Sequence, residues 1–126
     1  MADISISGNK MIKTVQSEFT KKFPYLRISI FPVSEKSKSS KTPFGGDTKI
    51  ADVRRKGTVG DISITGNKLV KSLEKEFETI YGLYAEVCYT EKDGGRYFTG
   101  STYDAMTLTT LNKEGEKKGW KKGVPR

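Results

Sequence analysis

The stretch Asp3–Lys13 reads DISISGNKMIK, and the stretch Asp61–Lys71 reads DISITGNKLVK. Eight of these eleven positions are identical, and the other three exchange Ser for Thr, Met for Leu and Ile for Val. At the same spacing along the chain, the Glu-Phe pair at 18–19 aligns with the pair at 76–77. Self-similarity of this extent at a fixed period indicates two copies of one structural unit. We therefore predict an internal duplication that spans nearly the whole chain of 126 residues.

The two predicted repeats, 3–57 and 61–115, each begin with a strand followed by a helix. Isoleucines alternate with Ser or Thr at 4–7 and at 62–65, which is typical of a strand with one buried face. Apolar residues then recur at helical spacing, which predicts a helix with one buried stripe in each repeat. The stripes are Met11, Ile12, Val15, Phe19 and Phe23, and Leu69, Val70, Leu73, Phe77 and Tyr81.

Short signals set the predicted limits of these helices. Asn9 and Asn67 are placed to cap the helix starts, because an Asn side-chain oxygen can accept a hydrogen bond from a first-turn amide. Pro24 and Gly82 are expected to end the same helices.

The rest of each repeat is predicted to be a second strand and a short closing helix. The second strands lie at 26–30 and 83–87, and in the second repeat the Asp-Gly-Gly turn at 93–95 leads into a further strand at 96–101. The closing helical turns are predicted at 50–56 and 108–114, each followed by a glycine suited to a helix C-terminus.

Together these elements predict an α+β fold, a two-layer sandwich of one mixed sheet with two helices on a single face. One repeat alone would bury only about 60% of its unfolded surface, so we expect both repeats to share one core. The prediction is a single pseudo-twofold, ferredoxin-like domain over residues 1–115, followed by a basic tail at 116–126. Two β-grasp-like halves are the alternative, because strand order cannot be read from one sequence.

Composition argues against most catalytic and metal-binding chemistry. The chain has no histidine and one cysteine, which excludes an internal disulfide and most zinc, haem and histidine-based catalytic arrangements. Neither a P-loop nor a dinucleotide-binding glycine motif occurs. We therefore expect a non-enzymatic protein with no cofactor. The chain also has no apolar run long enough to span a membrane and no signal-peptide pattern at its start, so a cytoplasmic location is expected.

The net charge of +8 is unevenly distributed. Residues 1–58 have 12 basic and 5 acidic side chains, residues 59–112 have 5 and 8, and residues 113–126 have 6 and 2. A basic half beside an acidic half favours head-to-tail self-association, and a cationic face favours a polyanion. The alternative is that surface charge changed after duplication without any partner.

Basic residues outside the predicted core are candidates for binding a polyanion, since phosphates bind Lys and Arg without sequence readout. The candidates are Lys36, Lys38, Lys41, Arg54, Arg55, Lys56, Lys117, Lys118, Trp120, Lys121 and Lys122. Each group has a structural alternative. The loop lysines are also typical of a solvated connection, and the cations at 54–56 suit a helix C-terminus without any ligand. Trp120 can stack on a base, or it can fold back over an edge of the core.

Polar residues of the strands are predicted to form the outward face of the sheet, which is either solvent-exposed or a docking surface. They are Ser5, Ser63, Thr65, Arg27, Ser29, Tyr84, Glu86 and Cys88. The sequence GRYF at 95–98 weakly resembles an aromatic motif of RNA-recognition domains, but no second aromatic motif accompanies it. Cys88 has no histidine to activate it, so we expect an inert structural thiol.

The repeated DISI-x-GNK segment, the Glu-Phe pairs, and the closing turns IADVR from Ile50 and LTTLN from Leu108 resemble a group of small uncharacterised bacterial proteins with a two-unit plan. The resemblance covers about residues 3–115 and implies a compact cytoplasmic bacterial domain. The group carries no known activity, so the resemblance transfers no functional residue.

Two functions are consistent with these observations. The first is an interaction module that binds another protein, or itself, through the open sheet face or an exposed strand edge. The second is weak, sequence-independent binding of nucleic acid by the basic first repeat and the Lys/Trp tail.

Overall fold

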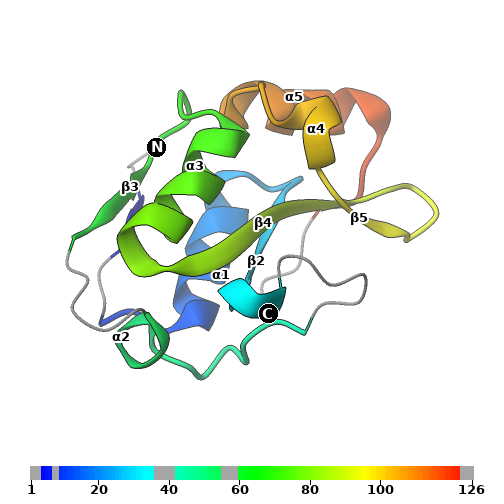
Figure 1. Cartoon of the computed structure of the whole chain (residues 1–126). Helices are drawn as coiled ribbons and strands as arrows, with labels where there is room; N and C mark the ends of the chain where they lie inside the picture. Colours follow the sequence, from blue (N-terminus) through cyan, green and yellow to red (C-terminus); the bar gives the residue numbers. More distant parts are fainter. Residues whose placement is uncertain (1–3, 7–8, 36–41, 55–59, 123–126) are drawn as a thin grey trace.

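The computed structural model describes residues 4–6, 9–35, 42–54 and 60–122, which form an α+β fold as predicted (Figure 1). The first half, residues 1–58, contains β1 (Ile4–Ile6), α1 (Ile12–Lys22), β2 (Arg27–Pro32), the 3-10 turn η1 (Val33–Glu35) and α2 (Ile50–Val53). The second half, residues 59–126, contains β3 (Ile62–Ile64), α3 (Val70–Glu76), the π-helical turn η2 (Phe77–Tyr81), β4 (Leu83–Thr90), β5 (Arg96–Phe98), α4 (Gly100–Tyr103) and α5 (Leu108–Lys118).

The described strands form two antiparallel sheets, so the predicted single mixed sheet is wrong. One sheet pairs β1 with β3, and the other has the order β2-β4-β5. Each half places its first strand in one sheet and its second strand in the other. Alternation along the sequence predicts the buried face of a strand, whereas the choice of its partner depends on contacts between the two halves. Neither the ferredoxin-like layout nor β-grasp-like halves are confirmed.

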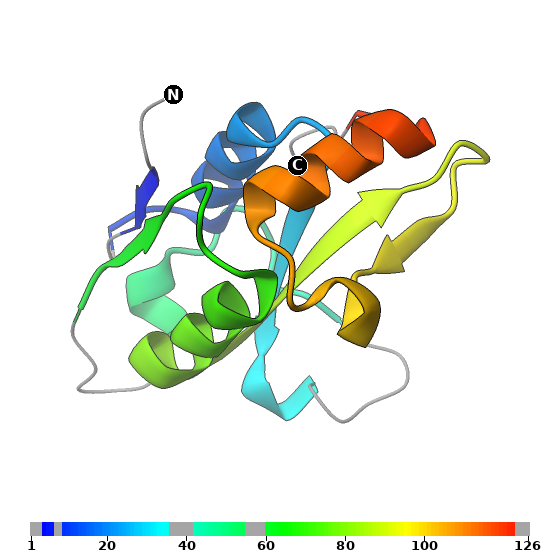
Figure 2. The ribbon, with the colours of Figure 1, turned by 90° about the horizontal axis from the view of Figure 1, so that it is seen from above.

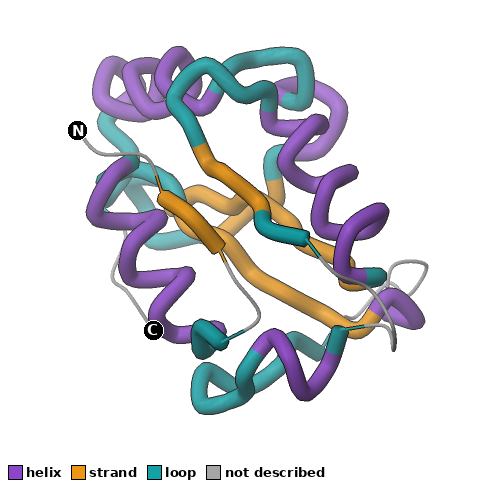
Figure 3. The backbone as a smooth tube through the Cα atoms, turned by 90° about the vertical axis from the view of Figure 1, so that its left-hand side faces the viewer, coloured by secondary structure: helices purple, strands orange, loops and turns teal. Residues whose placement is uncertain are grey.

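The small β1–β3 sheet and the two main helices, α1 and α3, lie over the larger sheet. Figure 3 shows the β1–β3 ribbon in front of the larger sheet, with α1 on one side and α3 on the other. In Figure 2 the β4–β5 hairpin lies at the end of the molecule away from β1 and β3. Helices α1 and α3 therefore cover only one face of the β2-β4-β5 sheet.

Matching positions of the two halves face each other in both sheets. In the small sheet Ser5 lies opposite Ser63, its equivalent in the second copy of the DISI segment. In the larger sheet Ser29 lies opposite Glu86, its equivalent when the second strands of the two halves are aligned from Leu26 and Leu83. Pairing between the halves thus brings equivalent residues to the centre of each sheet.

The starts of α1 and α3 rest on backbone contacts, so the predicted caps at Asn9 and Asn67 are wrong. Neither helix has a side-chain hydrogen bond at its N-cap, which is Met11 or Leu69. The first helical amides instead donate to the segment that precedes α2 or α5: Ile12 N to Thr48 O at 2.8 Å, and Val70 N to Met106 O at 2.9 Å. The neighbouring chain segment already accepts hydrogen bonds from the first helical amides, so these amides do not need the Asn side chain as an acceptor.

The C-terminal region differs from the prediction in two places. The strand predicted at 96–101 ends at Phe98, and the chain turns into α4. Helix α5 continues past 114 to Lys118 and ends at Gly119, whose φ of +76° is the left-handed conformation that glycine adopts readily. The domain boundary predicted at 115 therefore lies inside α5.

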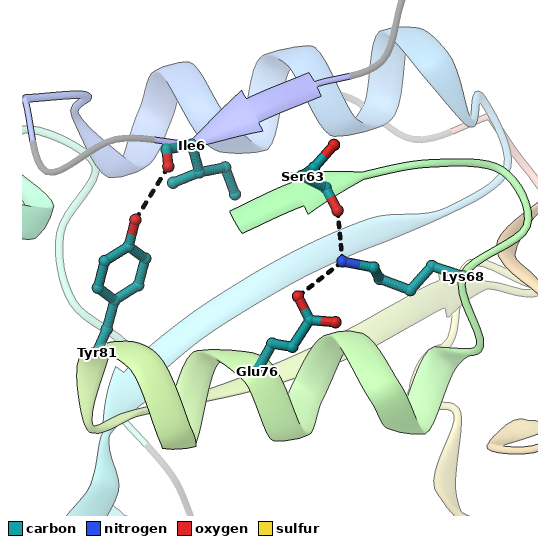
Figure 4. A network of polar contacts seen from close by, with 5 residues as sticks. All are labelled: Ile6, Ser63, Lys68, Glu76 and Tyr81. Carbon is teal, nitrogen blue, oxygen red and sulfur yellow. Dashed lines mark hydrogen bonds and ion pairs between the residues drawn. The ribbon is translucent and has the colours of Figure 1, made fainter. Parts of the chain in front are cut away.

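Buried apolar side chains from both halves form one cluster. Its largest fully buried members are Tyr81, Phe19, Phe77, Ile6, Ile12, Leu26, Ile30, Ile50, Ile62, Ile64, Leu73 and Leu83. Polar contacts join the same layers (Figure 4). The Tyr81 hydroxyl donates to the Ile6 carbonyl at 3.0 Å, and the Lys68 ammonium donates both to the Ser63 carbonyl and to Glu76.

Candidate functional site

The face of the β2-β4-β5 sheet that points away from α1 and α3 combines polar and aromatic side chains. Alternation along β2 and β4 buries residues such as Ile28 and Val87 toward the helices, and turns their neighbours outward. Arg27, Cys88 and Phe98 lie in register on the outer face, one on each strand. The predicted outward face is thus split: Ser5 and Ser63 belong to the separate β1–β3 sheet, where both are exposed.

A cavity of about 540 Å³ opens on this outer face, and we call it the outer cavity. Its lining residues are Gln16, Arg27, Ser29, Pro43, Phe44, Gly45, Gly46, Cys88, Arg96, Tyr97 and Phe98. The volume is within the usual range of small-ligand sites, roughly 300–1,000 Å³. Two arginines line the outer cavity, and no described acidic side chain does.

The wall of the outer cavity on the β2 side is built by hydrogen bonds to the edge of β2. Gln16 Nε2 donates to the Ile28 carbonyl at 3.1 Å, and the Phe44 amide donates to the Ile30 carbonyl at 2.9 Å. These bonds hold the loop segment that includes Phe44 beside the sheet. A Cβ placed on Gly45 would have no neighbouring atom within 4 Å, so the backbone of this loop is accessible there.

The opposite wall is the strand β5, all of whose residues are exposed. Phe98 and Tyr97 are each 46% exposed, which is unusual for aromatic side chains of this size. Phe98 contacts Phe31 edge-to-face, with ring centroids 6.1 Å apart. The contact with Phe31 supports Phe98 from the sheet, and the outer surface of Phe98 remains exposed.

Cys88 forms part of the floor of the outer cavity, and its thiol is not activated as a nucleophile. Its Sγ lies 3.7 Å from Ser29 Oγ and 3.5 Å from the Glu86 carbonyl oxygen. Burial raises the pKa of the Cys88 thiol to about 12, so the thiol stays protonated at neutral pH. This environment agrees with the structural role that we expect for Cys88.

A pair of carboxyl groups lies at the free edge of β4, beyond the end of β5. Glu74 reaches from α3 and accepts a hydrogen bond from the Val87 amide at 3.0 Å. Glu86 accepts a hydrogen bond from the Tyr84 hydroxyl. Burial, and then the nearby negative charge of Glu86, raise the pKa of Glu74 from 4.5 to about 8. Gln16 occupies the equivalent position of the first half and likewise bonds the edge of its strand.

The basic residues predicted to bind a polyanion are not gathered into one site among the described parts of the chain. Lys36, Lys38, Lys41, Arg55 and Lys56 lie outside the described residues. Arg54 follows α2 and is half-buried, whereas Lys117 and Lys118 are exposed in the last turn of α5. Helices α2 and α5 lie at opposite ends of the molecule (Figures 1 and 3).

The end of the chain described here returns to the larger sheet. Lys121 and Lys122 are exposed, and the Lys121 amide donates to the Thr90 carbonyl at 2.9 Å. Trp120 is only 5% exposed and stacks on Tyr89, with ring centroids 4.0 Å apart and planes inclined by 14°. The indole thus covers an edge of the core, which is the second of the two roles that the sequence suggested for Trp120. Its face is not available to a nucleic-acid base.

The sequence did not single out the loop residues of the outer cavity. Within the stretch SEKSKSSKTPFGGD, serines and lysines predict a solvated loop and obscure the aromatic residue Phe44. The only local signal is the sequence PFGG at 43–46, in which an aromatic residue precedes two glycines.

Comparisons with protein-family models, curated proteins and solved structures gave no match. Among the described residues, no three His, Cys, Asp or Glu side chains are gathered in a way that could hold a metal ion. No helix in the described ranges has both the length and the apolar character needed to cross a membrane.

Proposed function

We propose that this chain is a non-enzymatic protein-interaction module that binds an extended segment of a partner protein on the outer face of the β2-β4-β5 sheet. The observation that carries the proposal is the outer cavity, which lies on the sheet face that α1 and α3 leave uncovered. Exposed Phe98 borders it, and an exposed aromatic side chain beside a cavity is typical of binding surfaces.

Binding of nucleic acid has less support. The stacking partner that the sequence suggested, Trp120, is buried against Tyr89. The described basic candidates near α2 and α5 lie at opposite ends of the molecule. The candidates that the structure describes therefore do not offer a polyanion one site that includes both helices.

A peptide selection tests the proposal. Wild-type protein and a Gly45→Trp variant are immobilised, and a phage library of random dodecapeptides is selected on each. Because a Cβ at Gly45 would meet no atom within 4 Å and Gly45 lines the outer cavity, we expect the protein to accept the new indole there and the indole to obstruct the cavity. Thr79→Trp adds the same side chain at an exposed position of η2 and is the matched control.

Peptides enriched on the wild-type protein and on Thr79→Trp, but not on Gly45→Trp, would support the module. Equal enrichment on all three proteins, or none on any, would contradict it. Anisotropy titration with labelled single- and double-stranded oligonucleotides at low and high salt tests the second function: tight, salt-sensitive binding would favour nucleic acid.

A further inference from the structure

The basic end of the described chain has a defined place beside the larger sheet. Tyr89 alternates with outward-facing Cys88, so it lies on the inner face of β4, where Trp120 stacks on it. The next residue, Lys121, forms an isolated antiparallel bridge with Thr90, and its amide donates to the Thr90 carbonyl. Trp120 thus anchors this segment, and Lys121 is held beside β4 like a residue of an additional strand.

The register places three hydrogen-bond donors in one row on the outer face. Thr90 pairs with Arg96 of β5 on one side and with Lys121 on the other. Directly paired residues project to the same face, and alternation gives Thr90 the face of Cys88. We call Arg96, Thr90 and Lys121 the donor row. The Cα atoms of Arg96 and Lys121 are roughly 10 Å apart, so both long side chains can reach a group above Thr90.

The positive charge of the donor row is not neutralised within the described parts of the chain. Arg96 and Lys121 are exposed, and neither forms an ion pair with a described acidic side chain. The acidic residues closest in sequence are Glu91 and Asp93. Continued alternation directs Glu91 to the opposite face of β4, and the Asp93 carboxylate accepts a hydrogen bond from the Gly95 amide at 2.8 Å. A ligand of the donor row must therefore supply both negative charge and acceptors.

A phosphoryl group complements these three donors. Its terminal oxygens only accept hydrogen bonds when ionised, and a guanidinium can donate two parallel bonds to it. The Lys121 ammonium and the Thr90 hydroxyl can bond the remaining oxygens. A carboxylate has one oxygen fewer and a smaller charge, so it would engage the row less completely.

The donor row adjoins the outer cavity, because Arg96 also lines that cavity. We infer that the donor row binds a phosphorylated Ser or Thr of the partner segment that occupies the outer cavity. Arginine clusters recognise phosphorylated segments in several kinds of binding module. The inference rests on the proposed function, since it adds a condition to the same interaction: phosphorylation of the partner strengthens its binding.

An oriented peptide library tests the inference. Peptides with one fixed phosphoserine and degenerate flanks are passed over the immobilised wild-type protein, and the most enriched peptide is labelled for fluorescence anisotropy. Versions with Ser or Glu in place of the phosphoserine are the matched probes. The proteins are the wild type, Arg96→Gln, Lys121→Gln, Thr90→Val and Lys117→Gln, the last removing an equal charge from α5. Circular dichroism verifies that each variant is folded.

The phosphopeptide should bind the wild type at least tenfold more tightly than the Ser peptide. Arg96→Gln and Lys121→Gln should each weaken the phosphopeptide roughly tenfold, as expected for loss of one charge-assisted hydrogen-bonding partner. Thr90→Val should weaken it roughly threefold without any change of charge. Lys117→Gln should have little effect, and Lys121→Gln should leave the Ser peptide unchanged.

Three results would overturn the inference. Equal losses for Lys117→Gln and Lys121→Gln would mean that binding reflects net charge alone. A Glu peptide that binds as tightly as the phosphopeptide would show that the donor row does not select phosphoryl groups. A single-stranded oligonucleotide that binds more tightly than the phosphopeptide, and is weakened by Lys121→Gln, would assign the row to nucleic-acid phosphates.

The two proposals fail in different ways. If the phosphopeptide and the Ser peptide bind equally and Gly45→Trp abolishes both, the module stands and the phosphoryl preference is wrong. If the library yields no enriched peptide, inorganic phosphate is titrated and followed by NMR. A shift of the Thr90 and Lys121 amides that Lys121→Gln removes would then support the phosphoryl site and contradict the protein-interaction function.

Discussion

Gly115 lies on the buried face of α5, where two aromatic residues approach the helix backbone. A Cβ at this position would lie 2.6 Å from Trp120 Cε3 and 2.9 Å from Tyr25 Cβ. In an exposed helix, Ala in place of Gly would stabilise the protein by about 1 kcal/mol. Here we expect Gly115→Ala to destabilise it by roughly 1–3 kcal/mol, because the added methyl group overpacks a filled site.

Urea denaturation measures this effect, and Gly45→Ala is the control because its Cβ would meet no atom within 4 Å. Tryptophan fluorescence of the folded variant should also shift, since the indole of Trp120 is the nearest neighbour. A Gly115→Ala protein more stable than the wild type would show that Trp120 does not pack on α5 as described.

Glu74 should make stability depend on pH. Its pKa is about 8 in the folded protein and ordinarily 4.5, chiefly because of burial and then the charge of Glu86. Between these pH values the unfolded chain releases a proton that the folded protein retains, so the free energy of unfolding falls as the pH rises from about 4.5 to about 8. Below this range both states are protonated, and above it both are ionised.

Glu74→Gln should remove that decline, because an amide does not titrate and can still accept the hydrogen bond from Val87. Relative to wild type, the variant should gain about 2 kcal/mol of unfolding free energy between pH 4.5 and pH 8, a value reduced from the full shift to allow for solvent screening. Urea denaturation at several pH values measures it. Glu116→Gln replaces an exposed residue of α5, so its free energy of unfolding should change with pH in the same way as that of the wild type.

At the scale of elements, the sequence predicts the helices and turns that depend on residues close together in the chain. The apolar stripe predicts α1, and the Asp-Gly-Gly turn predicts the β4–β5 hairpin, in which Gly94 has a φ of +90°. The single mixed sheet and the helix caps at Asn9 and Asn67 were predicted wrongly, because sheet pairing and the contacts at these helix starts depend on segments distant in sequence. The outer cavity was missed for the same reason: Phe44, in a loop, comes to line one cavity with residues of β2 and β5 only after folding.

The joint between η2 and β1 depends on one buried hydrogen bond. The Tyr81 hydroxyl donates to the Ile6 carbonyl at 3.0 Å, and both residues are fully buried (Figure 4). Tyr81→Phe keeps the ring but leaves the carbonyl without this donor, so we expect a loss of roughly 1–2 kcal/mol of unfolding free energy. Thermal unfolding followed by circular dichroism tests this, with exposed Tyr97→Phe as the control. Equal stability of the two variants would contradict it.

At the scale of the whole molecule, the two halves depend on each other. The β1–β3 and β2–β4 pairings each join a strand of the first half to a strand of the second. Of the described pairings between named strands, only β4–β5 lies within one half. The shared apolar cluster likewise draws on both halves. Two small units, each with few apolar residues, thereby reach the burial that neither would reach alone.

This dependence predicts that fragments 1–58 and 59–126, prepared separately, lack a cooperative thermal transition, and that mixing them restores one. Circular dichroism and light scattering measure the transition and the 1:1 mass. A pair of second-half fragments should be disfavoured, because the register would place Glu86 opposite Glu86, whereas the intact chain places Ser29 there. Glu86→Ser in fragment 59–126 removes this repulsion and should promote its self-association. Cooperative unfolding of monomeric fragment 59–126 alone would contradict the shared core.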